Sequence, residues 1–138
     1  MYYFAYGSNL STKQMIRRCP HARVVGKARL SNYTLAFSGF SPRWQGGVAT
    51  IIPQPGAEVL GVVYALDQHC LEQLDGFEGV HLGHYYRQTI LVTRTDTGTE
   101  QATITYIRSS YAASRPTTAY RTTILEGARE HGLAITLP

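Results

Sequence analysis

The chain has 138 residues, of which 43% are hydrophobic and 16% are charged, and its formal net charge is +4. This composition excludes a disordered chain, and the length predicts a single domain, residues 1–138, that can bury its own core. The positive charges are scattered, with Arg17-Arg18 as the only adjacent basic pair, so no nucleic-acid partner is expected.

The remaining compositional signals favour a cytoplasmic protein. Met1–Tyr6 has no basic segment followed by a long apolar stretch, so no secretory signal is expected there. No apolar run approaches the length that crosses a bilayer, so no membrane partner is expected either. Cys19 and Cys70 form no disulfide framework and no paired metal motif. We therefore expect a reducing compartment, with both cysteines packed as core residues on helix faces.

The first predicted elements are a short strand and a short helix. Tyr2–Tyr6 is apolar and aromatic, as expected of a buried strand, and Gly7-Ser8-Asn9 ends it. Ser11–Gln14 matches a capping box, in which the last side chain reaches back to the first residue. The helix that follows should run to about Arg18, because Pro20 prevents its continuation.

Strands and a second helix are predicted in the middle of the chain. The predicted strands are Asn32–Ser38, Gly47–Ile52 and Glu58–Leu66. Asp67 can cap a helix that runs to about Asp75, and Gly76 is expected to stop it.

The C-terminal part predicts a hairpin and a third helix. Tyr85–Arg94 and Gln101–Arg108 are extended, and residues 96–98 between them have turn chemistry. The last helix should open near Pro116 and stop at Gly132. A sheet of this size must bury one face and hide its edges. We therefore predict an α+β fold, a small and mostly antiparallel β-barrel with a few short flanking helices.

The turn after the first strand is a candidate binding loop. Backbone N–H groups at a turn and a helix start are free donors, and glycine lets the chain approach a ligand closely. Such a place suits a carboxylate, a phosphate or a developing oxyanion. Spacing alone favours the plainer alternative, an ordinary turn in which Ser8 and Asn9 satisfy local backbone groups.

Glu78 is the candidate acid or base among the nine carboxylates. It lies between Phe77 and Gly79-Val80, just beyond a helix end. Apolar neighbours raise the pKa of a carboxyl group, which makes it a better base near neutral pH. The local context is equally compatible with an ordinary carboxylate in a surface loop.

Neither a metal site nor a serine nucleophile is expected. His81 and His84, even with His69 and Cys70 upstream, do not have the spacing of a metal site, so no metal is predicted. Ser8 lies in no nucleophile elbow and has no assignable histidine partner.

Four motifs in order resemble the γ-glutamylcyclotransferase family, which includes the AIG-type barrel proteins, and the resemblance covers nearly the whole chain. Tyr6–Leu10 resembles the family's N-terminal signature, Trp44–Ile51 a second stretch, and Leu74–Val80 its catalytic-glutamate segment. The C-terminal part is similar at Tyr106, Tyr111, Pro116, Tyr120, Ile124, Gly127-Ala128 and Gly132-Leu133.

The resemblance implies a small β-barrel and an intramolecular reaction. The α-amine of a γ-glutamyl group attacks its own γ-carbonyl, releasing 5-oxoproline and a free amino acid or amine, with no cofactor and no metal. Glu78 would then be the general base and acid. Backbone N–H groups of Gly7, Ser8, Asn9 and Leu10 would hold the glutamyl carboxylate and the carbonyl oxygen.

The resemblance also assigns pocket walls and partners. Tyr6 would line the pocket and Tyr120 would form a polar wall, whereas Trp44 and Gly46-Gly47 look structural. The expected partner is a small γ-glutamyl molecule, and the expected assembly is a monomer or a homodimer. Two alternatives stay open: the same chemistry on a γ-glutamyl amine or a γ-glutamyl-protected biosynthetic intermediate, and a small-molecule binding module without turnover.

Overall fold

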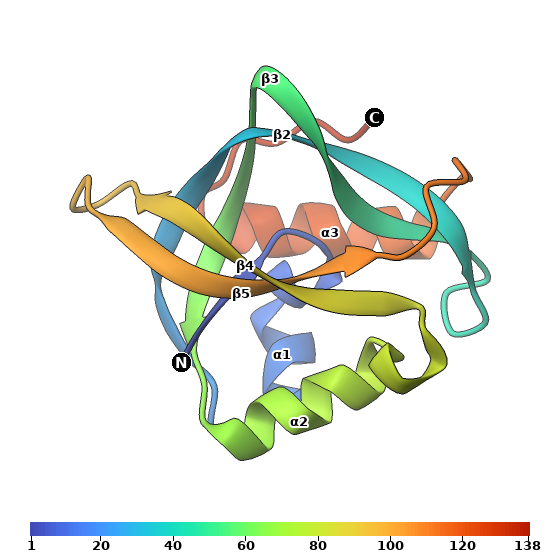
Figure 1. The fold of residues 1–138 in the computed structure, drawn as a ribbon, viewed down its shortest axis with the longest axis horizontal. Helices are drawn as coiled ribbons and strands as arrows, with labels where there is room; N and C mark the ends of the chain where they lie inside the picture. The colour runs from blue at the N-terminus through green and yellow to red at the C-terminus, as the bar shows by residue number, and fades with distance from the viewer.

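The computed structural model of the protein describes every residue, Met1–Pro138. Five strands form a closed barrel in the order β1-β3-β2-β4-β5 (Figure 1), which confirms the predicted fold class. The strands are β1 (Tyr2–Ala5), β2 (Arg23–Ser41), β3 (Gly46–Ala65), β4 (Tyr85–Arg94) and β5 (Glu100–Arg108). Neighbouring strands are antiparallel, except that β1 and β5 are parallel.

The β2–β3 hairpin is longer than the sequence predicted. Two of the predicted strands are parts of one strand, β3, which bends through its proline- and glycine-containing middle instead of ending there. Opposite this bend Asn32 has a φ of 66°, and its side-chain oxygen accepts a hydrogen bond from the N–H of Gly56 at 3.0 Å. The irregularity curves both strands, which a small closed barrel requires.

Three helices and two 3₁₀ turns complete the chain: η1 (Ser8–Leu10), α1 (Thr12–Arg18), α2 (Gln68–Phe77), η2 (Val80–Leu82) and α3 (Thr118–Glu130). Ser11 and Asp67 cap α1 and α2 as predicted. Gly76 does not stop α2, which continues to Phe77. Gly79, with a φ of 64°, follows the helix end instead. None of the helices combines the length and the apolar character that crossing a membrane requires.

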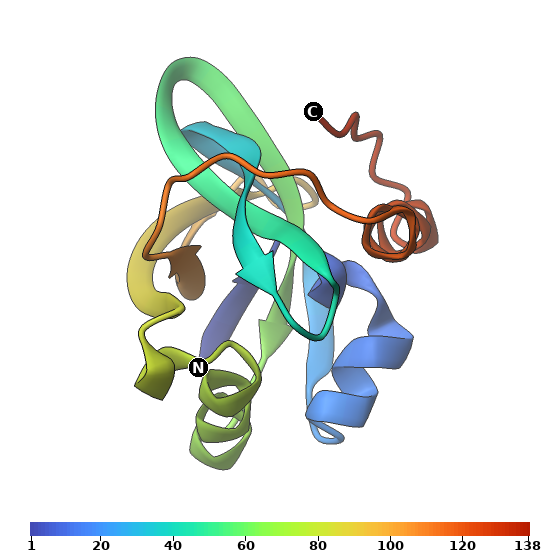
Figure 2. The ribbon, with the colours of Figure 1, turned by 90° about the vertical axis from the view of Figure 1, so that its right-hand side faces the viewer.

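The helices cover one side and one end of the barrel. Figures 1 and 2 show α2 across one end, α3 along the side, and α1 between them. Gly127 permits close packing of α3, because a Cβ there would lie 2.5 Å from the backbone nitrogen of Ser11. The core contains fully buried side chains from the barrel and from the helices, including Phe4, Leu74 and Ile124. The loop after β1 is therefore fixed between the barrel and α3.

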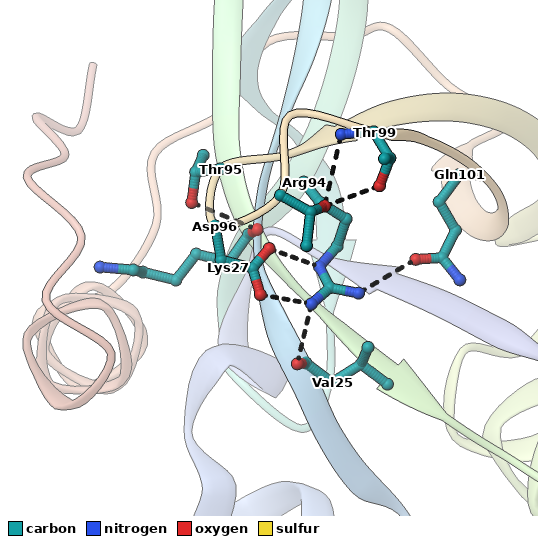
Figure 3. A network of polar contacts seen from close by, with 8 residues as sticks. Val25, Lys27, Arg94, Thr95, Asp96, Thr99 and Gln101 are labelled. Atoms are coloured by element: carbon teal, nitrogen blue, oxygen red, sulfur yellow. Dashed lines mark hydrogen bonds and ion pairs between the residues drawn. The ribbon is translucent and has the colours of Figure 1, made fainter.

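The barrel has two short seams: β1 and β5 share one residue pair in register, and β2 and β4 share two. Arg94 at the end of β4 holds the seam between β2 and β4 (Figure 3). Its guanidinium group pairs with Asp96 in the β4–β5 turn and donates to the carbonyl oxygen of Val25 on β2 at 3.3 Å. The predicted hairpin turn is thus confirmed, and its arginine also fastens the hairpin to the neighbouring strand.

Candidate active site

A pocket of about 280 Å³ opens where the end of β1, the β2–β3 turn and the C-terminal end of α2 meet. It brings together residues from Tyr3 to Tyr120 in the sequence. Six of the residues expected at the site from the sequence line it: Tyr6, Gly7, Ser8, Asn9, Glu78 and Tyr120.

Leu10 lies outside the pocket. Its side chain is fully buried in the hydrophobic core, and its N–H donates to the carbonyl oxygen of Gly7 at 3.0 Å. The N–H of Ser11 bonds Ser8 in the same way. The N–H groups of Gly7, Ser8 and Asn9 come earlier, so they have no partner within the turn. These three residues, and not Leu10, bring backbone donors to the pocket wall.

Glu78 is the one carboxylate among the lining residues. It is the C-cap of α2, so the end of the helix delivers it to the pocket. The side chain is half-buried. Burial raises the pKa of Glu78 to about 7, although the nearby guanidinium groups of Arg18, Arg108 and Arg43 act in the opposite direction. Glu78 can therefore gain or lose a proton near neutral pH.

The Asn9 side chain connects Glu78 to helix α1. Its Oδ1 accepts hydrogen bonds from Gln14 Nε2 at 3.0 Å and from Arg18 Nη1 at 3.2 Å. These two donors fix the amide orientation, so that Nδ2 points to Glu78 Oε1 at 3.5 Å and to the Tyr3 hydroxyl at 3.0 Å. Asn9 thus offers its side chain as well as its backbone to the site.

Gln14 does not reach back to the N-cap as the capping box predicted. Its Nε2 donates to Ser8 Oγ at 2.7 Å as well as to Asn9. Ser11 still accepts from the N–H of Gln14 at 3.3 Å, so one half of the box forms. The other half does not form, because the N–H of Ser11 donates to the carbonyl oxygen of Ser8 at 3.0 Å instead. Gln14 and Arg18 are four residues apart, on the helix face that meets the loop.

Tyrosines form the other walls of the pocket. The Tyr6 hydroxyl donates to the carbonyl oxygen of Tyr106, and the Tyr120 hydroxyl accepts from the N–H of Ala49 at 2.9 Å. Burial raises the pKa of both Tyr6 and Tyr120 well above the ordinary tyrosine value. Trp44, expected to be structural, packs edge-on against Tyr120 at 4.8 Å between ring centroids and also lines the pocket.

Asp75, one helical turn before Glu78, is committed to another role. Asp75 is buried. It forms a two-pronged ion pair with Arg87 on β4 and accepts from the Tyr106 hydroxyl at 2.7 Å. Hydrogen bonds from both partners lower the pKa of Asp75, despite the opposing effect of burial. This pair fastens α2 to the barrel and leaves Glu78 as the carboxylate able to exchange protons.

Sequence reasoning missed three arginines that line the pocket: Arg18, Arg43 and Arg108. Arg18 could have been indicated by its spacing from Gln14 on α1, because both side chains face the candidate binding loop after β1. Arg43 in the β2–β3 turn and Arg108 at the end of β5 carry no local signal, since only the closed barrel brings them near Glu78.

The two cysteines also differ from the expectation. Cys19, the C-cap of α1, and Cys70 on α2 are joined as a disulfide, with their Cα atoms 5.4 Å apart. Both are buried, as predicted for core residues. The expectation that they form no bridge was wrong because 51 positions separate them, and only the packing of α1 against α2 brings them together.

Comparison with known proteins agrees with this geometry. The model of the AIG2-like family matches residues 58–136. The curated "Gamma-glutamylcyclotransferase" of Mus musculus is 41% identical over 135 residues, 95% of this chain and 71% of that protein. The Homo sapiens protein of the same name is 39% identical over 137 residues, 96% of this chain and 72% of its own length.

Structural similarity extends over the same span. A solved structure entitled "Gamma-glutamyl cyclotransferase" superimposes with a TM-score of 0.92 and 37% sequence identity, covering 96% of this chain and 80% of that one. Sequence motifs, barrel topology and these relatives agree, and the chain therefore belongs to the AIG2-like, γ-glutamylcyclotransferase family.

Proposed function

We propose that this protein, acting as one domain over residues 1–138, closes a γ-glutamyl group into 5-oxoproline and releases the attached amino acid or amine. The observation that carries the proposal is the single carboxylate in the pocket, Glu78, whose pKa is raised to about 7 by burial. The relatives that bear the name of this activity support it.

The reaction begins with proton removal. The α-ammonium group of the substrate must become an amine, and the ionised Glu78 accepts its proton. The amine then attacks the γ-carbonyl carbon within the same molecule, so its effective concentration is already high. A carbon–nitrogen bond forms in the five-membered ring, and negative charge develops on the carbonyl oxygen.

Collapse of the tetrahedral intermediate completes the reaction. The free N–H groups of Gly7, Ser8 and Asn9 hold the substrate carboxylate and stabilise the oxyanion. Each donor to the oxyanion raises kcat by about 10²–10³-fold. Glu78 returns its proton to the departing nitrogen as the original amide bond breaks. The ring nitrogen loses its second proton to become the lactam N–H, and the released amine takes up that proton as an ammonium group. No water, metal or redox partner enters the balance. Tyr6 and Tyr120 shape the walls that hold the substrate in its folded form.

Asn9 orients Glu78 in this scheme. Its Nδ2 faces one carboxylate oxygen at 3.5 Å, while Arg18 and Gln14 hold its other end. Because the contact is long in the free protein, we expect it to shorten when substrate fills the pocket. Asn9 therefore acts as a positioning residue through its side chain, in addition to its backbone.

The product and a peptide substrate such as glutathione would place the protein in glutathione metabolism, and we propose a cytoplasmic location. In that compartment the Cys19–Cys70 bridge would be expected to be reduced. We propose a monomer or a homodimer as the working form.

Release of 5-oxoproline by the purified protein tests the function. The panel is γ-glutamyl-alanine, glutathione and γ-glutamyl-lysine, with Glu78→Gln as the control. We expect release from at least one substrate, and none above background from the variant. Release that persists in Glu78→Gln would remove the role given to Glu78. Binding of 5-oxoproline without turnover of any substrate would favour a binding module instead.

A further inference from the structure

Arg108 is a buried cation without a partner in the protein. It lies at the end of β5 and is 7% exposed, and its Nε is buried without any hydrogen bond. The ion pairs of the structure involve other residues. A buried, unpaired guanidinium group is strongly unfavourable unless something else supplies the opposite charge. The side chain lines the pocket that holds Glu78, so a ligand in that pocket can supply it.

The surroundings hold Arg108 in place without neutralising it. Its guanidinium carbon lies 5.3 Å from the ring centroid of Tyr85, which pairs with it across the β4–β5 ladder. On the other side it lies against Gly39 of β2, where any Cβ would overlap Nη2 of the arginine. The N–H of Arg108 is anchored to Thr50 Oγ1 at 3.0 Å. These contacts orient a charged group toward the pocket, as a binding site requires.

The other two pocket arginines are engaged differently. Arg18 donates to Asn9 and lies 4.9 Å from the Phe77 ring centroid. Arg43 is exposed and lies 5.2 Å from the same ring. With ionised Glu78, the three guanidinium groups give the pocket walls a net charge of +2. A γ-glutamyl amino acid has two carboxylates and one ammonium group, whereas a γ-glutamyl amine without a second carboxylate is neutral.

Arg108 also lies on a different wall from the loop that holds the glutamyl end in the proposed function. The loop belongs to the wall built by β1, η1 and α1, with Asn9 next to Glu78. Arg108 belongs to the wall built by β2, β4 and β5. Glu78 must reach both the attacking amine and the departing nitrogen. The leaving group therefore extends from Glu78 away from the loop, toward the second wall.

We propose that Arg108 is a specificity-determining residue that binds a carboxylate on the leaving group, so that the preferred substrates are γ-glutamyl amino acids or peptides rather than γ-glutamyl amines. This inference rests on the proposed function. A planar guanidinium group can bind both oxygens of a carboxylate at once, which gives direction as well as charge.

The test compares γ-glutamyl-alanine with γ-glutamyl-alaninamide, which differ only by the charge of the terminal group. We expect the wild-type protein to prefer the acid in kcat/KM by about 10- to 100-fold, the range of a hydrogen bond between charged partners. In Arg108→Met this ratio should fall toward 1, and Arg108→Lys should restore part of it. The effect of Arg108 on the pKa of Glu78 acts on both substrates and cancels in the ratio.

A stability measurement separates this role from a structural one. Methionine keeps the apolar stem of the arginine and removes the unpaired charge, so Arg108→Met should raise the Tm of the ligand-free protein. An arginine that served the fold would give a lower Tm instead. A lower Tm together with an unchanged substrate ratio would overturn the inference.

Affinity in a protein that cannot turn over keeps the two proposals distinguishable. Calorimetry on Glu78→Gln gives the Kd of both ligands, and Glu78→Gln with Arg108→Met should lose the preference for the acid. If the wild-type protein released no 5-oxoproline, the proposed function would fail, and these affinities would still decide the role of Arg108. If Arg108→Met weakened the binding of both ligands equally, Arg108 would be assigned to the glutamyl carboxylate, and the inference would be refuted.

Discussion

Replacing Glu78 by glutamine should abolish ring closure and stabilise the protein at the same time. The pKa of Glu78 is raised from 4.5 to about 7, chiefly by burial. The folded protein therefore holds this proton over a pH range in which the unfolded chain has lost it. As the pH rises from about 4.5 to 7, this difference lowers the free energy of unfolding. The negative charge on Glu78 that the proposed reaction needs is therefore unfavourable for the folded state.

The size of the effect follows from the shift. One pKa unit corresponds to about 1.4 kcal/mol, so the full penalty is on the order of 3 kcal/mol. Between pH 5 and pH 8, about 2 to 3 kcal/mol of it should develop. For a chain of this length that corresponds to a Tm difference of roughly 5–10 °C. Glu78→Gln removes the titrating group, so its advantage over the wild-type protein should appear at pH 8 and shrink at pH 5.

Two assays on the same protein preparations check this prediction. Urea unfolding at pH 5 and pH 8 gives the stability of both proteins, and 5-oxoproline release gives their activity. Glu72→Gln on the exposed face of α2 is the matched control and should keep wild-type activity. The assignment of the raised pKa to burial would be refuted if Glu78→Gln were less stable than the wild type at pH 8. It would also be refuted if the difference in free energy of unfolding between the two proteins were the same at pH 5 and pH 8.

Three further predictions follow from the contacts around the site. Asn9→Ala removes a donor to the ionised Glu78, so the midpoint of the kcat/KM–pH profile should move upward by about one unit, and Asn9→Asp should be more harmful still. Reduction of the Cys19–Cys70 bridge should lower stability by up to about 4 kcal/mol, measured as the Tm of the oxidised protein with and without reductant; two thiols that stay alkylatable after mild oxidation of the native protein would contradict the bridge. Asp75→Asn breaks an ion pair that is buried on one side only, and should cost about 1–2 kcal/mol in urea unfolding. Because the pKa of Asp75 is lowered, its contribution should be present at neutral pH and disappear as the pH falls below about 4.

Local signals predicted local structure well. The alternation in Gln101–Arg108 and the turn before it identified the β4–β5 hairpin, and the caps Ser11 and Asp67 marked both helix starts. The interpretation failed where tertiary structure overrides a local breaker. Proline and glycine in the middle of β3 bend the strand, because a small barrel needs sharply curved strands.

The candidate site also contains residues that local sequence indicates and residues that only the tertiary structure brings together. Glu78 and the loop after β1 could be found because a short run of neighbouring residues resembles a known family. Arg18 could have been indicated only by its spacing from Gln14 on α1. Arg43 reaches the pocket from the β2–β3 turn and Arg108 from the last strand, so neither has a sequence neighbour that indicates its role. The cysteine bridge was missed for the same reason, since 51 positions separate its ends.

The free protein holds a charge arrangement that a ligand would complete in the proposed function. Three guanidinium groups act to keep Glu78 ionised, yet burial still raises its pKa to about 7. None of the three is within ion-pair distance of that carboxylate. If Arg108 closed onto Glu78, the pair would neutralise both groups, and neither the base nor the anion-binding cation would be available. The contacts of Arg108 with Tyr85 and Gly39 keep it apart. In the proposed reaction, the stability lost by holding the two charges separate is recovered when a carboxylate and an ammonium group of the substrate occupy the space between them.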